Sequence, residues 1–140
     1  MAVTAISLTP TVLKDSIFTL GNYSYSGAVS NVTFTPTSTS VTAKGLTPGA
    51  VYTDTTTATW TVSITFLQDW DTVNSLSSVL FDNEGQTLPL TFAPNAKVGK
   101  ALWTANVKLV PGTVGGAGDA FMTATVTLGI TGKPVKTAVA

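Results

Sequence analysis

Apolar and hydroxyl side chains alternate strictly along residues 58–67. The apolar parity holds Trp60, Val62, Ile64 and Phe66, and the hydroxyl parity holds Thr59, Thr61, Ser63 and Thr65. Successive side chains of a strand point to opposite faces, so this pattern predicts a strand with one buried face and one uncharged polar face. Shorter or less regular alternations predict further strands at residues 2–8, 16–20, 31–36, 40–44, 87–92, 101–110 and 120–131.

A change of period after residue 67 predicts one helix, at about residues 72–83. Val73, Leu76 and Leu80 recur at spacings of three and four, which places them on one helical face that packs on the core. Asp71 or Thr72 can cap the start of this helix, and a left-handed glycine after residue 83 can end it. The chain is therefore predicted to be mainly β, an antiparallel β-sandwich or open barrel with one flanking helix.

The whole of residues 1–140 is predicted to form a single domain, because the length suits one ordinary core. Gly132, Lys133 and Pro134 are expected to stop the last strand, which makes residues 135–140 a C-terminal tail.

Residues 46–57 are predicted to be a loop, with a turn at Pro48-Gly49. The loop has more apolar side chains than a solvated loop requires, and two interpretations are open. These side chains fold back onto the core, or they dock on a neighbouring copy of the chain. On the second interpretation the residues in contact between subunits are Leu46, Thr47, Pro48, Val51, Tyr52 and Asp54.

The chain is unusually poor in charge. Seven lysines balance seven acidic residues, so that 10% of residues are charged against about 25% in a typical domain, and the net charge is zero. Soluble monomers usually keep a charged surface that opposes association. The composition fits either a β domain with a neutral surface or a surface covered by copies of itself, since uncharged faces pack together without burying charge.

The sequence offers little for catalysis or ligand binding. It has no cysteine and no histidine, which removes thiolate chemistry, the usual general base and the commonest metal ligand. The acidic pairs near residues 70 and 83 are explained by the ends of the helix, and the glycine-rich segment 111–119 lacks the Lys-Ser/Thr ending of a phosphate loop. We therefore expect no catalytic, cofactor-binding or metal-binding residues, no cofactor, and neither an enzyme nor a nucleic-acid binder.

The N-terminus lacks the features of a secretory signal, and no apolar run approaches the roughly 20 residues of a membrane helix. We therefore expect no membrane partner.

Four runs occur in a distinctive order: GLTPGAVYTD at Gly45–Asp54, TWTVSITFLQDWD at Thr59–Asp71, NSLSSVLFDNEG at Asn74–Gly85 and TATVTLGITGKP at Thr123–Pro134. Together they resemble the major tail (tail tube) proteins of long-tailed, non-contractile bacteriophages, over nearly the whole chain after about residue 29. The resemblance implies a β-sandwich with a flanking helix that assembles into hexameric rings. These rings stack into a hollow tube that conducts the genome.

The same resemblance implies the partners and the location. The partners are copies of the chain itself, other tail proteins such as the tape measure and the tail terminator, and double-stranded DNA in transit without specific binding. The location is the tail of the virion, after assembly in the host cytoplasm.

In such a tube the hydroxyl side of the wall faces either the channel or an adjoining copy. The residues expected to face the channel are Thr59, Thr61, Ser63, Thr65, Thr123, Thr125 and Thr127. Lysines in a channel would hold DNA through counterion release, so we expect a neutral or slightly acidic lining with the lysines elsewhere.

Two other classes of protein fit the composition. A capsid decoration or head–tail connector protein would also be charge-poor, β-rich and self-associating. A carbohydrate-binding or Ig-like surface module would need an exposed aromatic platform, and the aromatic residues left for one are Trp70, Tyr23, Tyr25 and Tyr52.

Overall fold

The computed structural model describes residues 2–140. Nine strands and one helix lie in this range: β1 (Ile17–Leu20), β2 (Tyr23–Ser24), β3 (Val29–Thr37), β4 (Ser40–Lys44), β5 (Val51–Thr55), β6 (Thr59–Leu67), α1 (Leu76–Asp82), β7 (Thr87–Ala93), β8 (Ala101–Lys108) and β9 (Thr123–Ala138). The prediction of a mainly β fold with one short helix is confirmed.

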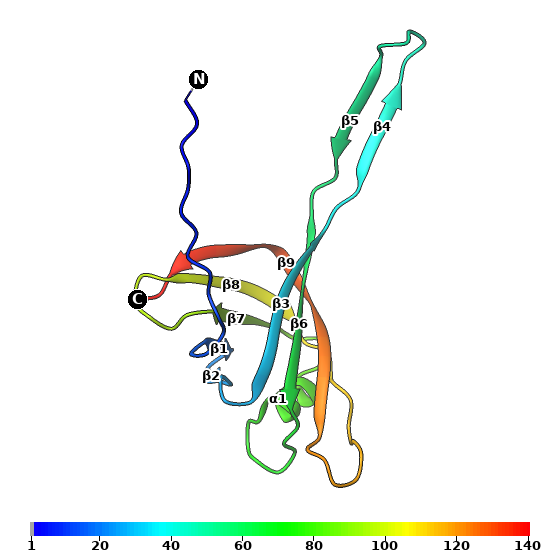
Figure 1. Cartoon of the computed structure of the whole chain (residues 1–140). Helices are drawn as coiled ribbons and strands as arrows, with labels where there is room; N and C mark the ends of the chain where they lie inside the picture. Colours follow the sequence, from blue (N-terminus) through cyan, green and yellow to red (C-terminus); the bar gives the residue numbers. More distant parts are fainter. Residues whose placement is uncertain (1) are drawn as a thin grey trace.

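Seven of the strands form one antiparallel sheet in the order β2-β1-β7-β8-β9-β6-β3. The sheet curves around an apolar core as an open barrel, and α1 lies at the end of the barrel where β6 ends and β9 begins (Figure 1). One aromatic pair spans the core, with the rings of Phe34 on β3 and Phe92 on β7 centred 6.1 Å apart. The barrel has two uncovered edges, at β1–β2 and at β3.

Strand β6 is the centre of this wall, paired with β3 on one side and β9 on the other. Its apolar parity is buried as predicted, with Val62, Ile64 and Phe66 in the core. The apolar parities of β8 and β9 are buried in the same way, through Val107 and Leu128 among others. Period-two alternation therefore gave the correct inner face for each of these strands.

Beyond the barrel, β3 and β6 continue into a second, two-stranded sheet, the β4–β5 hairpin. This hairpin projects from the end of the barrel opposite α1 (Figure 1). The prediction that residues 46–57 are a loop is therefore wrong for Val51–Thr55, which form β5. Only residues 45–50 make the turn, where the Ala50 carbonyl accepts a hydrogen bond from the Gly45 N–H at 2.7 Å.

The two ends of the chain depart from the predictions. Residues 2–8 alternate but form no strand, because no other strand lies beside them. Strand β9 continues through the predicted stop to Ala138, so the expected tail at residues 135–140 is largely strand. A bulge makes this possible: Gly132 takes a positive φ of 78°, and pairing with β8 resumes at Val135 opposite Thr104.

The helix begins later than predicted. Ser75, with extended backbone, is its N-cap and accepts a hydrogen bond from the Ser78 N–H, so neither Asp71 nor Thr72 caps it. Val73 precedes this cap and is 83% exposed, which overturns its assignment to the packing face. Leu76 and Leu80 are buried in the core, as predicted. The helix ends at Asp82 with Asn83 as its C-cap, so the predicted terminating glycine, Gly85, lies two residues beyond the cap, with a φ of +84°.

Candidate assembly surfaces

The hairpin exposes apolar side chains on both of its faces. Opposite residues of an antiparallel pair share a face, so Val41, Ala43, Tyr52 and Asp54 lie on one side. Val51 lies on the other side, opposite Lys44. All these side chains are exposed, and Leu46 at the tip is fully exposed at 107% of its reference area.

Local hydrogen bonds connect the hairpin to the barrel. At the junction, the Thr56 N–H donates to the Thr39 carbonyl and the Thr39 N–H donates to the Thr56 hydroxyl, at 2.8 and 2.9 Å. Within the hairpin, the Thr42 and Thr53 hydroxyl oxygens lie 3.4 Å apart. A two-stranded hairpin without a covering layer is only marginally stable in water, so this segment lacks the packing that stabilises the barrel.

All six predicted contact residues lie in this projecting segment: Leu46, Thr47, Pro48, Val51, Tyr52 and Asp54. Their exposure excludes the interpretation that the loop folds back onto the core. Contact with a neighbouring copy stays a prediction.

A second uncovered segment is the N-terminal arm, residues 2–13. It has no charged residue, and its apolar side chains are all exposed: Val3, Ile6, Leu8, Val12 and Leu13. No hydrogen bond joins it to the rest of the described chain. In the view of Figure 1 the arm and the hairpin both extend away from α1. Sequence reasoning missed this surface, although a charge-free run with five large apolar side chains was a readable signal.

The outer side of the barrel carries a surface that we call the hydroxyl face, formed by Asn31, Thr33, Thr35, Thr61, Ser63, Thr65, Thr125 and Thr127. Paired residues make its rows, such as Thr33–Ser63–Thr127 across β3, β6 and β9. In the next row, the hydroxyl oxygens of Thr65 and Thr125 lie 2.9 Å apart. The other predicted channel residues, Thr59 and Thr123, extend the same face at opposite ends.

The expectation that the lysines lie elsewhere needs one correction. Lys108 pairs with Gly129, which in turn pairs with Thr61, so Lys108 continues a row of this face. Its position follows from the register of β8 against β9, which the sequence does not display. Within residues 2–140, no acidic residue lies in the strands that make this face. The face is therefore slightly basic at its β8 edge.

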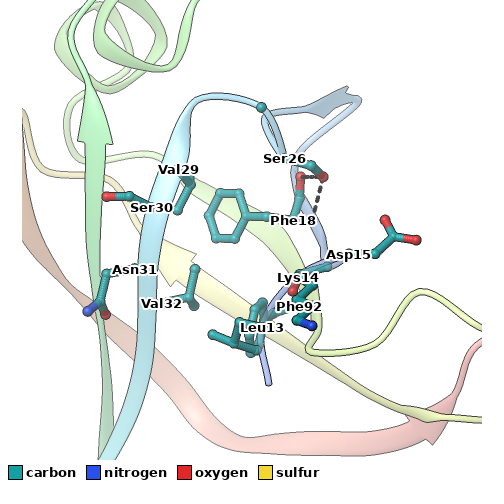
Figure 2. Close-up of a pocket in the computed structure, with 12 residues that line it drawn as sticks. Leu13, Lys14, Asp15, Phe18, Ser26, Val29, Ser30, Asn31, Val32 and Phe92 are labelled. Atoms are coloured by element: carbon teal, nitrogen blue, oxygen red, sulfur yellow. Dashed lines mark hydrogen bonds between the residues drawn. The ribbon is translucent and has the colours of Figure 1, made fainter. Parts of the chain in front are cut away.

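The fourth feature is a groove at the seam between the two edges of the barrel. It has a volume of about 380 Å³, and its apolar lining comes from Leu13, Phe18, Val29, Val32 and Phe92. Figure 2 shows the Phe18 and Val32 side chains pointing into it from opposite walls. The Ser26 hydroxyl accepts a hydrogen bond from the Phe18 N–H at 2.9 Å and so holds the turn at one end of the groove.

The end of the barrel near α1 is tightly hydrogen-bonded. The Gln68 amide group donates to the Gly115 and Thr123 carbonyls and accepts from the Gly115 N–H and the Trp70 indole, which connects two long loops. Nearby, the Asp69 carboxylate accepts from the Asp71 and Thr72 N–H groups, both at 3.1 Å. Its hydrogen bonds with Thr72, and then with Asp71, hold the Asp69 pKa below its usual value.

The aromatic residues do not gather into a platform. Tyr25 is buried, its hydroxyl donates to the Asn74 carbonyl at 2.9 Å, and burial, with a smaller contribution from Tyr23, raises its pKa. Trp70 is half-buried with its ring edge-on to Phe81. The exposed tyrosines, Tyr23 and Tyr52, belong to β2 and β5.

Within residues 2–140, no three His, Cys, Asp or Glu side chains come together as a set that could hold a metal ion. The helix of the described chain is too short to cross a membrane.

No protein-family description matches the sequence. No curated protein matches it significantly.

Proposed function

We propose that this chain is a structural subunit that assembles with copies of itself, in the manner of the phage tail tube proteins that its sequence resembles. The observation that carries the proposal is the contrast between a well-packed barrel and two uncovered apolar extensions, the hairpin and the N-terminal arm. Exposed apolar segments of this size mark interaction sites. With 10% charged residues and zero net charge, the chain has little electrostatic repulsion to oppose association.

On this proposal the copies form rings, six to a ring, that stack into the tube of a virion tail. The tape measure and the tail terminator are its other partners, and assembly takes place in the host cytoplasm. The chain has no catalytic role. Edge strands, which soluble monomers usually protect, serve here as joining surfaces.

The hydroxyl face lines the channel in this arrangement. Lysine-rich surfaces bind DNA tightly because they release counterions from its phosphates. Threonine and serine hydroxyls are uncharged and so contact passing DNA without this binding. Lys108, at the edge of this face, is a positive charge that would lie beside the DNA.

Negative-stain electron microscopy of the purified protein, with sedimentation velocity across a range of concentrations, tests the proposal. Six-fold rings or tubes support it. Trimers, or assembly only on capsids, would instead favour a capsid decoration or head–tail connector protein. A strict monomer at high concentration, with and without tail partners, would overturn self-assembly, and glycan binding by that monomer would favour the surface-module alternative.

A further inference from the structure

The wall of the barrel has a gap between β1 and β3. These strands lie at or next to the two ends of the sheet order and share no ladder with each other. The connection between them holds one side of the gap through a hydrogen bond from the Tyr25 N–H to the Phe18 carbonyl. The groove described above occupies the gap, with Phe18 on one wall and Val29 and Val32 on the other. Closing a barrel requires a strand in such a gap, because only closure removes both edges.

The β3 edge is suited to pairing. The strand is nine residues long, from Val29 to Thr37, and contains no charged residue. Natural proteins usually protect an exposed edge with charges, prolines or covering segments. Here a single proline, Pro36, lies near the far end, away from the groove. The half of β3 that borders the groove therefore presents an unprotected edge with Val29 and Val32 directed inward.

The N-terminal arm has the properties of the missing strand. It is extended, uncharged and unpaired, and Ile6 and Leu8 share one parity, so both would face the same side of a sheet. Its twelve residues could span about 40 Å, which is enough to reach a neighbouring molecule.

The base of the arm directs it away from its own groove. The Asp15 carbonyl accepts a hydrogen bond from the Ala96 N–H, and the Ser16 hydroxyl donates to the Pro94 carbonyl, both at 2.9 Å. These bonds fix the start of the arm to the β7–β8 connection. Leu13 lines the near end of the groove, but the residues before it, Thr9–Val12, lie beside Trp103 of β8 and do not continue along the groove.

We propose that the N-terminal arm of one copy inserts between β1 and β3 of a second copy, as the eighth strand of that copy's barrel. Ile6 and Leu8 enter the groove beside Phe18 and Val32, and the arm's backbone pairs with the free edge of β3. The inference rests on the proposed self-assembly and names the surface that each copy uses. The contact joins different surfaces of the two copies, so it propagates into a ring or a filament.

Cysteine cross-linking tests this directly, because the chain has no cysteine of its own. One full-length variant carries Ile6→Cys and a second carries Val32→Cys; the two are mixed, assembled and oxidised. A disulfide between them can form only between two copies, and only when their Cα atoms lie within about 7 Å. The matched control replaces Val32→Cys with Thr127→Cys, which sits on the hydroxyl face.

The expected result is a cross-linked dimer with Val32→Cys and none with Thr127→Cys. Assembled rings or tubes without the Val32 cross-link would overturn the strand insertion and leave the proposed function standing. A protein that never assembles would overturn both. A chain carrying Ile6→Cys and Val32→Cys together gives a further check: an internal disulfide in the dilute monomer would mean that the arm fills its own groove, against the inference.

Removing residues 2–12 supplies an independent measurement. No hydrogen bond joins these residues to the rest of the described chain. The deletion should therefore leave the thermal midpoint of the barrel unchanged and abolish assembly. Assembly unchanged by the deletion would overturn the inference. If the truncated chain instead unfolds, the double variant Ile6→Ser, Leu8→Ser keeps the arm's length and must still lose assembly.

Discussion

The strand pair β3–β6 and the hairpin β4–β5 are two halves of one continuous ribbon, built from similar residues. In the barrel half, β6 has a neighbour on each side and an apolar core beneath it, and Val62 and Ile64 are fully buried. In the projecting half, Val41 and Tyr52 have one partner strand, no covering layer and large exposed areas. The same alternation thus gives buried apolar side chains in the barrel half and exposed apolar side chains in the projecting half. On the proposed assembly, a neighbouring copy supplies the covering layer that the projecting half lacks.

The largest difference between the halves should appear on removal of apolar side chains. Leu80→Ala, at a fully buried position on α1, should lower the free energy of unfolding by about 2–5 kcal/mol through transfer and cavity terms. Leu46→Ala, at the exposed hairpin tip, should change it by less than about 0.5 kcal/mol. Chemical denaturation of the dilute protein measures both changes. Equal losses of unfolding free energy would show that the hairpin is packed as tightly as the barrel.

For assembly, unlike stability, substitutions on the hairpin should have the larger effect. Leu46→Lys with Tyr52→Lys places two charges on the apolar surface of the hairpin, which should raise the concentration needed for assembly at least about tenfold, equivalent to about 1.4 kcal/mol. Val73→Lys, also highly exposed but outside the hairpin, is the control. Sedimentation velocity measures assembly and chemical denaturation checks folding. Normal assembly by the hairpin variant would show that the hairpin is not a contact.

The hydroxyl face provides a subtler comparison, between two parts of one wall. Thr61→Lys with Ser63→Lys should leave tubes intact and slow DNA release from assembled particles, and added salt should relieve the delay. Lys108→Ala, at the edge of the same face, should have the opposite and smaller effect. Loss of assembly in the double variant would identify the face as a subunit contact and move the channel to another surface.

The smallest expected effect concerns Asp69, whose folded-state pKa is depressed by hydrogen bonds with Thr72 and Asp71. A depressed pKa means that its stabilising contribution is present above the unfolded pKa of about 3.9 and is lost as the pH falls through the folded value. Asp69→Asn keeps an acceptor but removes the charge. The thermal midpoints of the two proteins should differ most at pH 6 and converge near pH 2. A constant difference across that range would exclude the charge as the cause.

The sequence predicted the body of the fold well because periodicity records which side chains share a face. Alternation assigned the buried side of β6 and the matching parity of β9 correctly. It cannot record whether a strand has a partner, and so residues 2–8 were predicted as a strand that the structure does not contain. For the same reason the register that brings Lys108 beside Gly129 could not be foreseen.

Local competition explains the error at the helix. Asp71, Thr72 and Ser75 are all residues that cap helices, and the spacing of Val73 to Leu76 fits one turn. The Asp69 carboxylate bonds instead to the two N–H groups that follow it, which forms a turn and delays the helix to Ser75. Three-residue spacing alone does not distinguish these outcomes. The candidate contact residues lie on the projecting hairpin, where the sequence showed turn residues and surplus apolar side chains but not the pairing of β5 with β4; their contact with a neighbouring copy stays a prediction.

The place of β9 in the sheet has a consequence for the order of folding. The ribbon from β3 to β6 is a local hairpin, whereas β9 must return across some sixty positions, as in the Thr65–Thr125 pair, to join β6 to β8. Long-range pairing is slow because the chain loses the entropy of closing the loop before the new contacts stabilise it. During synthesis the N-terminal arm and the hairpin therefore leave the ribosome while the wall is still open. Until residues 123–138 arrive, β6 and β8 each expose an edge, and the nascent chain passes through a stage at which premature association competes with completion of its own barrel.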